Sequence, residues 1–330
     1  MTDNTIDATA ENKNFRKRIF LFKLSKTGYK VFHYTLLTLL SFILLYPLLY
    51  MLSMSLRPAS QLLDPTIVWI PRQFTLENII NVWNRINFLS ALRQSTVVSL
   101  GTSLLQIASC ALTGYGFARF KFKFKGLLFA IVLLTIIVPP QTIIIPSYLQ
   151  FRFFDFFGLT KIVSVITGQK IYVNLLNTVW TYFLPGIFAN GIRSGLFIFI
   201  FRQFFRGIPQ DLEDAAYIDG CGIVKTFVRI VVPCATGAFV TVFLFSFLWY
   251  WNDYYYGSMM LQNANTLTLA LAGLMDSFRT ATSTTELENP YEIYALLQAG
   301  CLLVVFPMLI LFAFFQRFFV ESIERTGIVG

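Results

Sequence analysis

Long apolar segments separated by short polar ones dominate the chain from residue 31 onward. A helix needs about 20 apolar residues to cross the hydrocarbon core of a bilayer. Segments of this length predict six transmembrane helices, at residues 31–54, 93–118, 126–149, 180–204, 236–260 and 295–318. The pattern therefore predicts an all-α integral membrane protein that crosses the membrane several times.

One polar stretch, between the fourth and fifth predicted spans, has the pattern of two short helices joined at a glycine. Pro209 suits a first helical position, since its missing N–H would have no partner there. Acidic residues follow in the first turns, where the helix dipole favours negative charge. Gly220 can adopt the left-handed conformation that ends a helix. A second helix, with Phe227 and Ile230 at helical spacing, is expected to end at Pro233.

Prolines interrupt the third predicted span at Pro139 and Pro140. Proline removes a backbone donor and breaks helical hydrogen bonding. Such a break is tolerated within a membrane where protein or water covers it. A hinge and a plain kink both fit this pattern.

Composition supports the membrane assignment independently of the segment pattern. Hydrophobic residues make up 56% of the chain and charged residues only 13%. Soluble domains average about 45–50% and about 25% respectively. The low share of charged residues therefore favours a membrane protein.

The net charge of +9 does not indicate a nucleic-acid-binding protein, because the basic residues gather beside the ends of the predicted spans. Cytoplasmic loops carry an excess of Lys and Arg. Four cations fall within residues 119–125, which is the clearest single indication that this loop is cytoplasmic. The rule places both termini and the polar stretch 207–233 in the cytoplasm.

This orientation divides the chain into four parts. Residues 1–30 form a basic cytoplasmic tail, and residues 31–91 hold the first span and an extracellular loop. Residues 92–319 form a five-helix core with the cytoplasmic loop 207–233, and residues 320–330 form a cytoplasmic C-terminal tail. The stretch 161–177 has the character of an insertion on the outer side.

Motifs for catalysis and for cofactor or metal binding are missing from the sequence. No glycine-rich phosphate loop of the form G-x-x-x-x-G-K-[ST] occurs, so the chain is not expected to bind ATP. The four cysteines form no C-x-x-C pair, and the single histidine is His33. We therefore expect no enzyme active site, no metal and no cofactor on this chain.

Polar residues within the spans are candidates for function, because their burial in lipid is costly. In the fourth span these are Asn190, Arg193 and Ser194. They could donate hydrogen bonds to a polar solute. Arg193 could equally pair with an acid of a partner subunit or extend outward to the membrane surface.

A second polar group stands in the outer half of the fifth predicted span, at Trp251, Asn252 and Asp253. An aromatic belt at the membrane interface would account for a tryptophan there. The polar pair is expected to face inward in a structural role, with contact to a solute as the second possibility.

The polar stretch also carries a resemblance to a known family. The pattern Glu-Ala-Ala, three residues, Gly, nine residues, Ile, one residue, Leu-Pro marks the inner-membrane permeases of ATP-binding-cassette (ABC) importers. Here it stands as Asp214-Ala215-Ala216, Gly220, Ile230 and Val232-Pro233, with Asp for Glu and Val for Leu.

Further pieces resemble the carbohydrate-uptake branch, in particular its maltose-type second permease. They are Tyr46-Pro47-Leu48, Ser55-Leu56-Arg57-Pro58, Thr75-Leu76-Glu77-Asn78, Tyr115–Phe120, Arg202–Phe205, Trp251-Asn252-Asp253 and Gln316–Val320. Together they cover roughly residues 30–330 in order.

The resemblance implies a type I ABC importer permease of the cell membrane that takes up a sugar. It implies a second, homologous permease, two cytoplasmic ATPase subunits that bind ATP-Mg, and an extracellular solute-binding protein. The residues implied to couple this chain to the ATPase are Asp214, Ala215, Ala216, Asp219, Gly220, Phe227, Ile230 and Pro233.

Three other interpretations remain open from the residues alone. A permease for amino acids, peptides or another polar solute would share the Ala-Ala-Gly loop. An ion-coupled carrier would need carboxylates within the spans, where only Asp253 occurs. The polar stretch could also rest on the membrane surface, although anionic lipid would repel its acidic first helix.

Overall fold

The computed structural model describes residues 4–327, apart from 65, 68, 156–157, 159, 161–164, 167–171, 263–264 and 283–289. Most of the predicted insertion at 161–177, and the last three residues of the predicted C-terminal tail, lie outside the described residues. The regular secondary structure of the described part is helical, and the one β-type pairing there is an isolated antiparallel bridge between Phe154 and Val173.

The principal helices follow one another along the chain as α1 (Asn4–Ser55), α2 (Glu77–Arg85), α3 (Phe88–Arg119), α4 (Lys125–Ile137), α5 (Pro140–Arg152), α7 (Trp180–Ile187), α8 (Ser194–Gly207), α9 (Asp211–Ile218), α10 (Ile223–Thr226), α11 (Val232–Cys234), α12 (Thr236–Trp251), α13 (Tyr255–Met260), α14 (Leu267–Thr282) and α15 (Pro290–Gly327). Residues 227–231, between α10 and α11, form a π-helix.

Within the part of the chain that the structure describes, three helical segments are long and apolar enough to cross a membrane without a break: Lys26–Ser55, Phe88–Arg119 and Tyr291–Gln316. Two further spans arise if each bent pair of helices counts as one. One pair is α4 with α5, at an angle of 101°, and the other joins Ile223–Cys234 to α12 at 80°. The first bend lies at Pro139, where the sequence predicted an interruption.

The span predicted at residues 180–204 does not form one continuous helix. Residues 188–193 separate α7 from α8, and two non-glycine residues in this break, Ala189 and Arg193, have left-handed φ values of 52° and 60°. The predicted span at 236–260 is likewise interrupted, since α12 ends at Trp251 and α13 begins at Tyr255. Polar side chains meet at both of these breaks.

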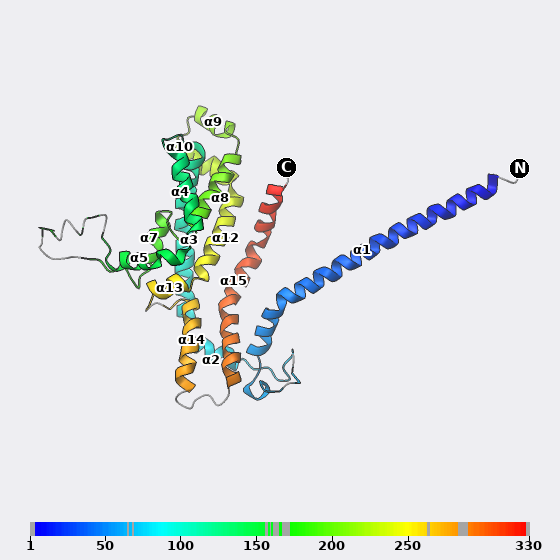
Figure 1. Cartoon of the computed structure of the whole chain (residues 1–330), viewed down its shortest axis with the longest axis horizontal. Coiled ribbons are helices and arrows are strands. Elements are labelled where there is room, and N and C mark those ends of the chain that lie inside the picture. Colours follow the sequence, from blue (N-terminus) through cyan, green and yellow to red (C-terminus); the bar gives the residue numbers. More distant parts are fainter. Residues whose placement is uncertain are drawn as a thin grey trace.

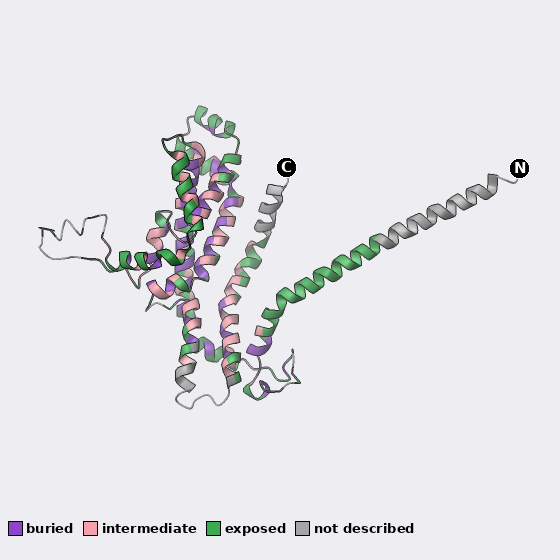
Figure 2. Cartoon of the chain, in the orientation of Figure 1, coloured by how far each residue is buried: buried purple, intermediate pink, exposed green. Residues whose placement is uncertain are grey.

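α1 leaves the rest of the molecule at an angle (Figure 1). It begins at Asn4, so the region predicted as a basic tail continues without interruption into the first span. Its residues from 26 to 47 are exposed over a largely apolar sequence (Figure 2). Such a surface has to be covered by lipid or by another protein chain.

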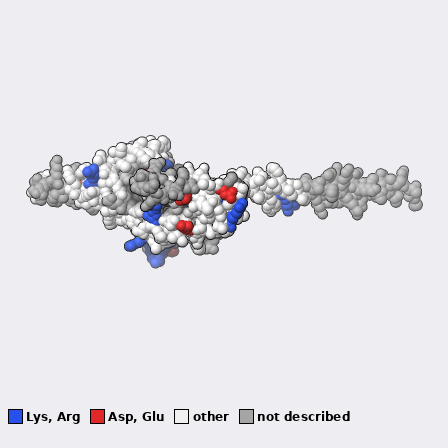
Figure 3. Space-filling model, turned by 90° about the horizontal axis from the view of Figure 1, so that it is seen from below, with Lys and Arg blue, Asp and Glu red and all other residues white. Residues whose placement is uncertain are grey.

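α3 is the centre of the helix bundle. It packs against α7, α8 and α12, and polar side chains of small or medium size along it, including Ser95, Thr102 and Gln106, are buried. Small residues let helices approach closely in a membrane. Viewed from the end that carries α2 and α14, the surface is mainly uncharged, with Lys, Arg, Asp and Glu in small groups (Figure 3).

The two ends of the bundle differ in character. α9 and α10 lie at one end, and α2 and α14 lie at the other (Figure 1). A core of α3, α8 and α12 side chains, which includes Phe197, Phe201 and Phe205, supports the α9 end. A separate core around Val82, Trp251 and Leu267 joins α2, α12 and α14 with α15 at the opposite end.

Candidate functional site

A cavity of about 560 Å³ lies where the third and fourth predicted spans are both broken. Its walls come from α4, α5, α7, α8 and the break between α7 and α8, with single side chains from α12 and α13. Ligand pockets commonly measure about 300–1,000 Å³. The cavity is therefore large enough for a small polar solute.

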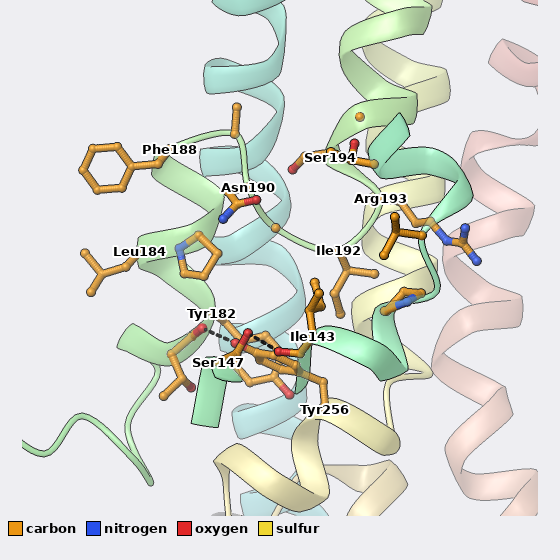
Figure 4. Close-up of a pocket in the computed structure, with 18 of the residues that line it drawn as sticks. Ile143, Ser147, Tyr182, Leu184, Phe188, Asn190, Ile192, Arg193, Ser194 and Tyr256 are labelled. Atoms are coloured by element: carbon orange, nitrogen blue, oxygen red, sulfur yellow. Dashed lines mark hydrogen bonds between the residues drawn. The ribbon is translucent and has the colours of Figure 1, made fainter. Parts of the chain in front are cut away.

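Aromatic and polar side chains meet at one end of this cavity (Figure 4). The rings of Tyr182 and Tyr256 stand edge to face, with centroids 5.1 Å apart. The Tyr182 hydroxyl donates to Oδ2 of Asp253 at 2.8 Å, and the backbone N–H of Tyr256 donates to Oδ1 at 3.0 Å. Asp253 thus fixes the tyrosines at the break between α12 and α13 and is not itself part of the cavity wall.

Gln106 of α3 holds the break between α7 and α8 in place. Its Nε2 donates to the backbone oxygen of Ile192 at 2.8 Å and to the Ser194 hydroxyl oxygen at 2.7 Å. Its Oε1 accepts from the Ser246 hydroxyl at 2.7 Å. Gln106 is fully buried, and leaving one of its groups unpaired would cost about 1–3 kcal/mol.

The Tyr250 hydroxyl makes a second contact to this break, by accepting from the backbone N–H of Ile192 at 3.0 Å. Gly191 lies beside the Tyr250 hydroxyl. A Cβ at that position would collide with the Tyr250 hydroxyl and approach Nε2 of Gln106 to 3.0 Å. The close approach of backbone to these two side chains requires glycine.

The predicted pathway residues divide into two groups. Asn190, Arg193 and Ser194 all line the cavity, although the Arg193 guanidinium points away from Asn190 (Figure 4) and lies 5.5 Å from the centre of the Trp249 ring. Trp251 is buried against the core shared by α2, α14 and α15, and Asn252 is exposed and bonded to the Leu248 oxygen. These two residues do not line the cavity.

The polar stretch 207–233 forms the α9 end of the molecule. α9 begins at Asp211, two residues later than the proline pattern predicted, and residues 223–234 continue through a π-helical turn to Cys234, past the predicted end at Pro233. Gly220 has a φ of +77° and no atom within 4 Å of the place where a Cβ would stand. The left-handed conformation predicted there is confirmed.

The residues predicted to couple to an ATPase differ in exposure. Ala216 is buried, and Phe227 and Ile230 are half-buried against the body of the protein. The others are exposed, namely Asp214, Ala215, Asp219, Gly220 and Pro233. Large apolar side chains stand exposed beside them, including Ile218 at 87% and Val224 at 75%. This surface suits a protein partner.

A buried ion pair attaches α9 to the end of α3. Arg119 Nε donates to Oε1 of Glu213 at 2.6 Å, and the Tyr115 hydroxyl donates to Oε2 at 2.7 Å. A second guanidinium nitrogen of Arg119 donates to the Ile208 oxygen at 2.7 Å. The Tyr115 ring also lies 4.9 Å from that of Phe227. One end of α3 therefore binds both halves of the polar stretch.

Sequence reasoning did not identify Glu213 and Gln106 as structural anchors. In the sequence, Glu213 was interpreted only as an acidic residue that interacts favourably with the helix dipole. Arg119 was interpreted only as one of the cytoplasmic cations. The sequence did contain an indication that Glu213 faces the body of the protein, because Glu213 and Ala216 are three residues apart and so share a helix face. Gln106 is an amide among apolar and small residues, which is itself a signal for a buried hydrogen-bond network.

Comparisons with known proteins agree on the kind of molecule. The family described as binding-protein-dependent transport system inner membrane component matches residues 110–325. The chain is 28% identical to the arabinooligosaccharides transport system permease protein AraQ of Halalkalibacterium halodurans, over 88% of this chain and 93% of that protein. It is 26% identical to the lactose transport system permease protein LacG of Rhizobium radiobacter, over 88% and 94%.

A solved structure has the same fold. It is the crystal structure of a bacterial ABC transporter involved in the import of the acidic polysaccharide alginate, matched with a TM-score of 0.69 at 18% identity over 89% of this chain and 98% of that one. At this identity the match establishes the fold alone. With the family match over about two thirds of its length, the chain belongs to the inner-membrane components of binding-protein-dependent transport systems.

Proposed function

We propose that this chain is one permease subunit of an ABC importer for a sugar or oligosaccharide, in the cell membrane. It has the type I fold with six spans, the fourth of them formed by α7, the break and α8. Both termini and the α9 end face the cytoplasm. One observation carries the proposal. The helix α3 holds both the break beside the cavity and the exposed, glycine-hinged segment at one end of the molecule.

The sugar assignment is supported by the transport systems to which the relatives belong and by the wall of the cavity. AraQ and LacG are permeases of arabinooligosaccharide and lactose transport systems. Tyr182 and Tyr256 supply aromatic surface, and Asn190 and Ser147 supply hydrogen-bonding groups. Amphipathic rings beside polar groups suit sugars, whose faces are apolar and whose rims carry hydroxyls. An amino acid or peptide permease is the less favoured alternative.

The chain performs no catalysis and binds no cofactor in this proposal. ATP-Mg is bound and hydrolysed by two partner ATPase subunits, and a second, related permease completes the pathway. An extracellular binding protein delivers the sugar at the α2–α14 end. The exposed face of 207–233, with Asp214, Ala215 and Asp219, seats on the ATPase, so that closure of the ATPase pair moves α9.

The proposal is tested by uptake in cells that carry the complete importer. Deletion of this permease should abolish uptake of a radiolabelled oligosaccharide, and the wild-type gene should restore it. Uptake of labelled amino acids and peptides in the same cells serves as the control. Loss of amino acid or peptide uptake, with sugar uptake unchanged, would contradict the sugar assignment.

A further inference from the structure

A cluster of cations lies where α4 and α8 meet, at the end of the bundle that carries α9. Lys121, Lys123 and Lys125 approach from the loop and first turn of α4, and Arg202 and Arg206 from the last two turns of α8. Lys125 is within electrostatic reach of Lys121, Arg202 and Arg206. Two elements far apart in sequence thus bring four positive charges to one seam, and Lys123 stands in the same loop.

The geometry of the seam follows from helical spacing. Lys125 and Phe129 are four residues apart on α4, as are Arg202 and Arg206 on α8, so each pair lies on one helix face. The Arg202 guanidinium carbon lies 3.9 Å from the centre of the Phe129 ring. The basic face of α8 therefore lies against the Lys125–Phe129 face of α4.

No carboxylate neutralises this cluster among the residues whose side chains the structure describes. The ion pairs there are Arg72 with Asp64 and Arg119 with Glu213, and neither involves the seam. Nε of Arg202 is buried and has no hydrogen-bond partner. A guanidinium within a predicted span is expected to have an anionic partner. Arg202 has none among the described residues, so its position is a candidate anion site.

The surroundings of the cluster are apolar and exposed. Phe122 and Phe124 alternate with the three lysines, and Phe124 is 73% exposed. Further into the span, α4 has no buried residue and exposes Leu127 and Leu128. An amphiphile with an anionic head fits this arrangement, because the cations meet its head and the apolar side chains meet its tails.

We propose that the seam between α4 and α8 binds an anionic phospholipid of the inner leaflet, with its phosphate at Lys125, Arg202 and Arg206. The choice of leaflet rests on the orientation proposed above. Basic pockets between transmembrane helices on the cytoplasmic side are suited to lipid head groups. A soluble phosphate would leave the exposed apolar side chains without a role.

The test measures lipid retained by the purified permease pair with its ATPase subunits, using native mass spectrometry in a neutral detergent. Phosphatidylglycerol and phosphatidylcholine with identical acyl chains are the two probes. We expect phosphatidylglycerol to be retained preferentially by the wild type. The double variant Arg202→Gln/Arg206→Gln should lower that affinity by about tenfold or more, since each surface cation contributes on the order of fivefold.

Two further variants make the result specific. Lys225→Gln/Arg229→Gln removes two cations, also four residues apart and at the same end of the molecule, and should retain the lipid as the wild type does. Arg202→Lys/Arg206→Lys keeps the charge and should keep most of the affinity. If the Gln variant does not assemble, Arg206→Gln alone, at an exposed position, should still show a loss of about fivefold.

Several results would overturn the proposal. These are equal retention of both lipids by the wild type, an equal loss in the Lys225/Arg229 control, and binding of soluble glycerol phosphate as tight as that of the lipid. A Leu128→Cys crosslink into the second permease would also overturn it, because that chain would then cover the seam. None of these measurements depends on sugar transport, so failure here is distinguishable from failure of the proposed function.

Discussion

Arg119 and Glu213 are 94 residues apart in sequence and are joined by a 2.6 Å ion pair in which both side chains are almost fully buried. Removing one partner of a buried ion pair leaves an uncompensated charge and costs about 3–5 kcal/mol. In this protein, loss of the ion pair would weaken the attachment of α9 to α3. α9 is the element that we propose to seat on the ATPase, so the pair bears directly on coupling.

The first prediction concerns this attachment. Glu213→Gln should loosen α9, seen as faster amide hydrogen exchange over 211–218 in the assembled importer, and should lower stimulation of the ATPase by loaded binding protein. Arg119→Gln should do the same. In a double-mutant cycle the two effects should be strongly non-additive, because both variants remove one interaction. Simple additivity would contradict the anchoring role.

The second prediction concerns Gly220, where a left-handed backbone disfavours a side chain, Asp less than most, and where an added carboxylate would stand on the exposed surface of the loop. Gly220→Asp should leave the permease inserted and paired with its sister subunit. Retention of the ATPase on co-purification, and sugar uptake, should both fall severely. Asn265→Asp, an exposed position outside 207–233, is the control and should be nearly silent. Wild-type uptake and ATPase retention in Gly220→Asp would refute the docking role.

The third prediction uses the close approach at Gly191. Gly191→Ala should displace the break between α7 and α8, at a cost of about 1–3 kcal/mol for overpacking, and should reduce uptake. Tyr250→Phe removes the colliding oxygen. The double variant should therefore recover part of the activity lost in Gly191→Ala, even though Tyr250→Phe alone loses the bond from Ile192. Greater loss in the double variant than in either single one would contradict this geometry.

The fourth prediction concerns Arg193. Asparagine tolerates the left-handed conformation found there, so Arg193→Asn removes the charge while keeping the backbone. Uptake should fall at least tenfold while the importer still assembles with its ATPase subunits. Arg193→Lys should be intermediate. Unchanged uptake, or failure of the complex to assemble, would favour a structural or subunit-pairing role instead.

The fifth prediction concerns orientation. Single cysteines at Lys123 and Gln210, both exposed, are placed in a variant lacking the four native cysteines. A membrane-impermeant maleimide should label neither site in intact cells and both in opened cells. A cysteine at Asn265 should react in intact cells. Labelling of Lys123→Cys from outside would reverse the proposed topology.

Helix content and the ends of the bundle could be predicted well from the sequence, because the apolar segments are long and the polar stretch between them is distinctive. The breaks were harder. The break between α4 and α5 could be predicted from Pro139, because proline cannot donate a backbone hydrogen bond. The break at 188–193 contains no proline: its left-handed residues are Ala189 and Arg193, and hydrogen bonds that stabilise it come from Gln106, 86 residues before Ile192 in the sequence.

The candidate cavity shows the same limit. Asn190, Arg193 and Ser194 could be named because polar residues in an apolar segment are conspicuous. Trp251 and Asn252 were equally conspicuous, yet the cavity does not include them, because helix rotation and packing decide which face a side chain occupies. Tyr182 and Tyr256 were indistinguishable from the other aromatic residues until the fold brought them together.

α3 carries two anchor points on one unbroken helix: Gln106, which holds the break beside the cavity, and Arg119, which holds α9. Thirteen residues separate them, or about 20 Å of helix. Exchange of the docking segment between related importers would therefore fail if residues 207–233 were moved alone, since the incoming segment needs a matching partner at positions 115 and 119. Chimaeric permeases should therefore take the last turn of α3 and residues 207–233 from the same parent protein.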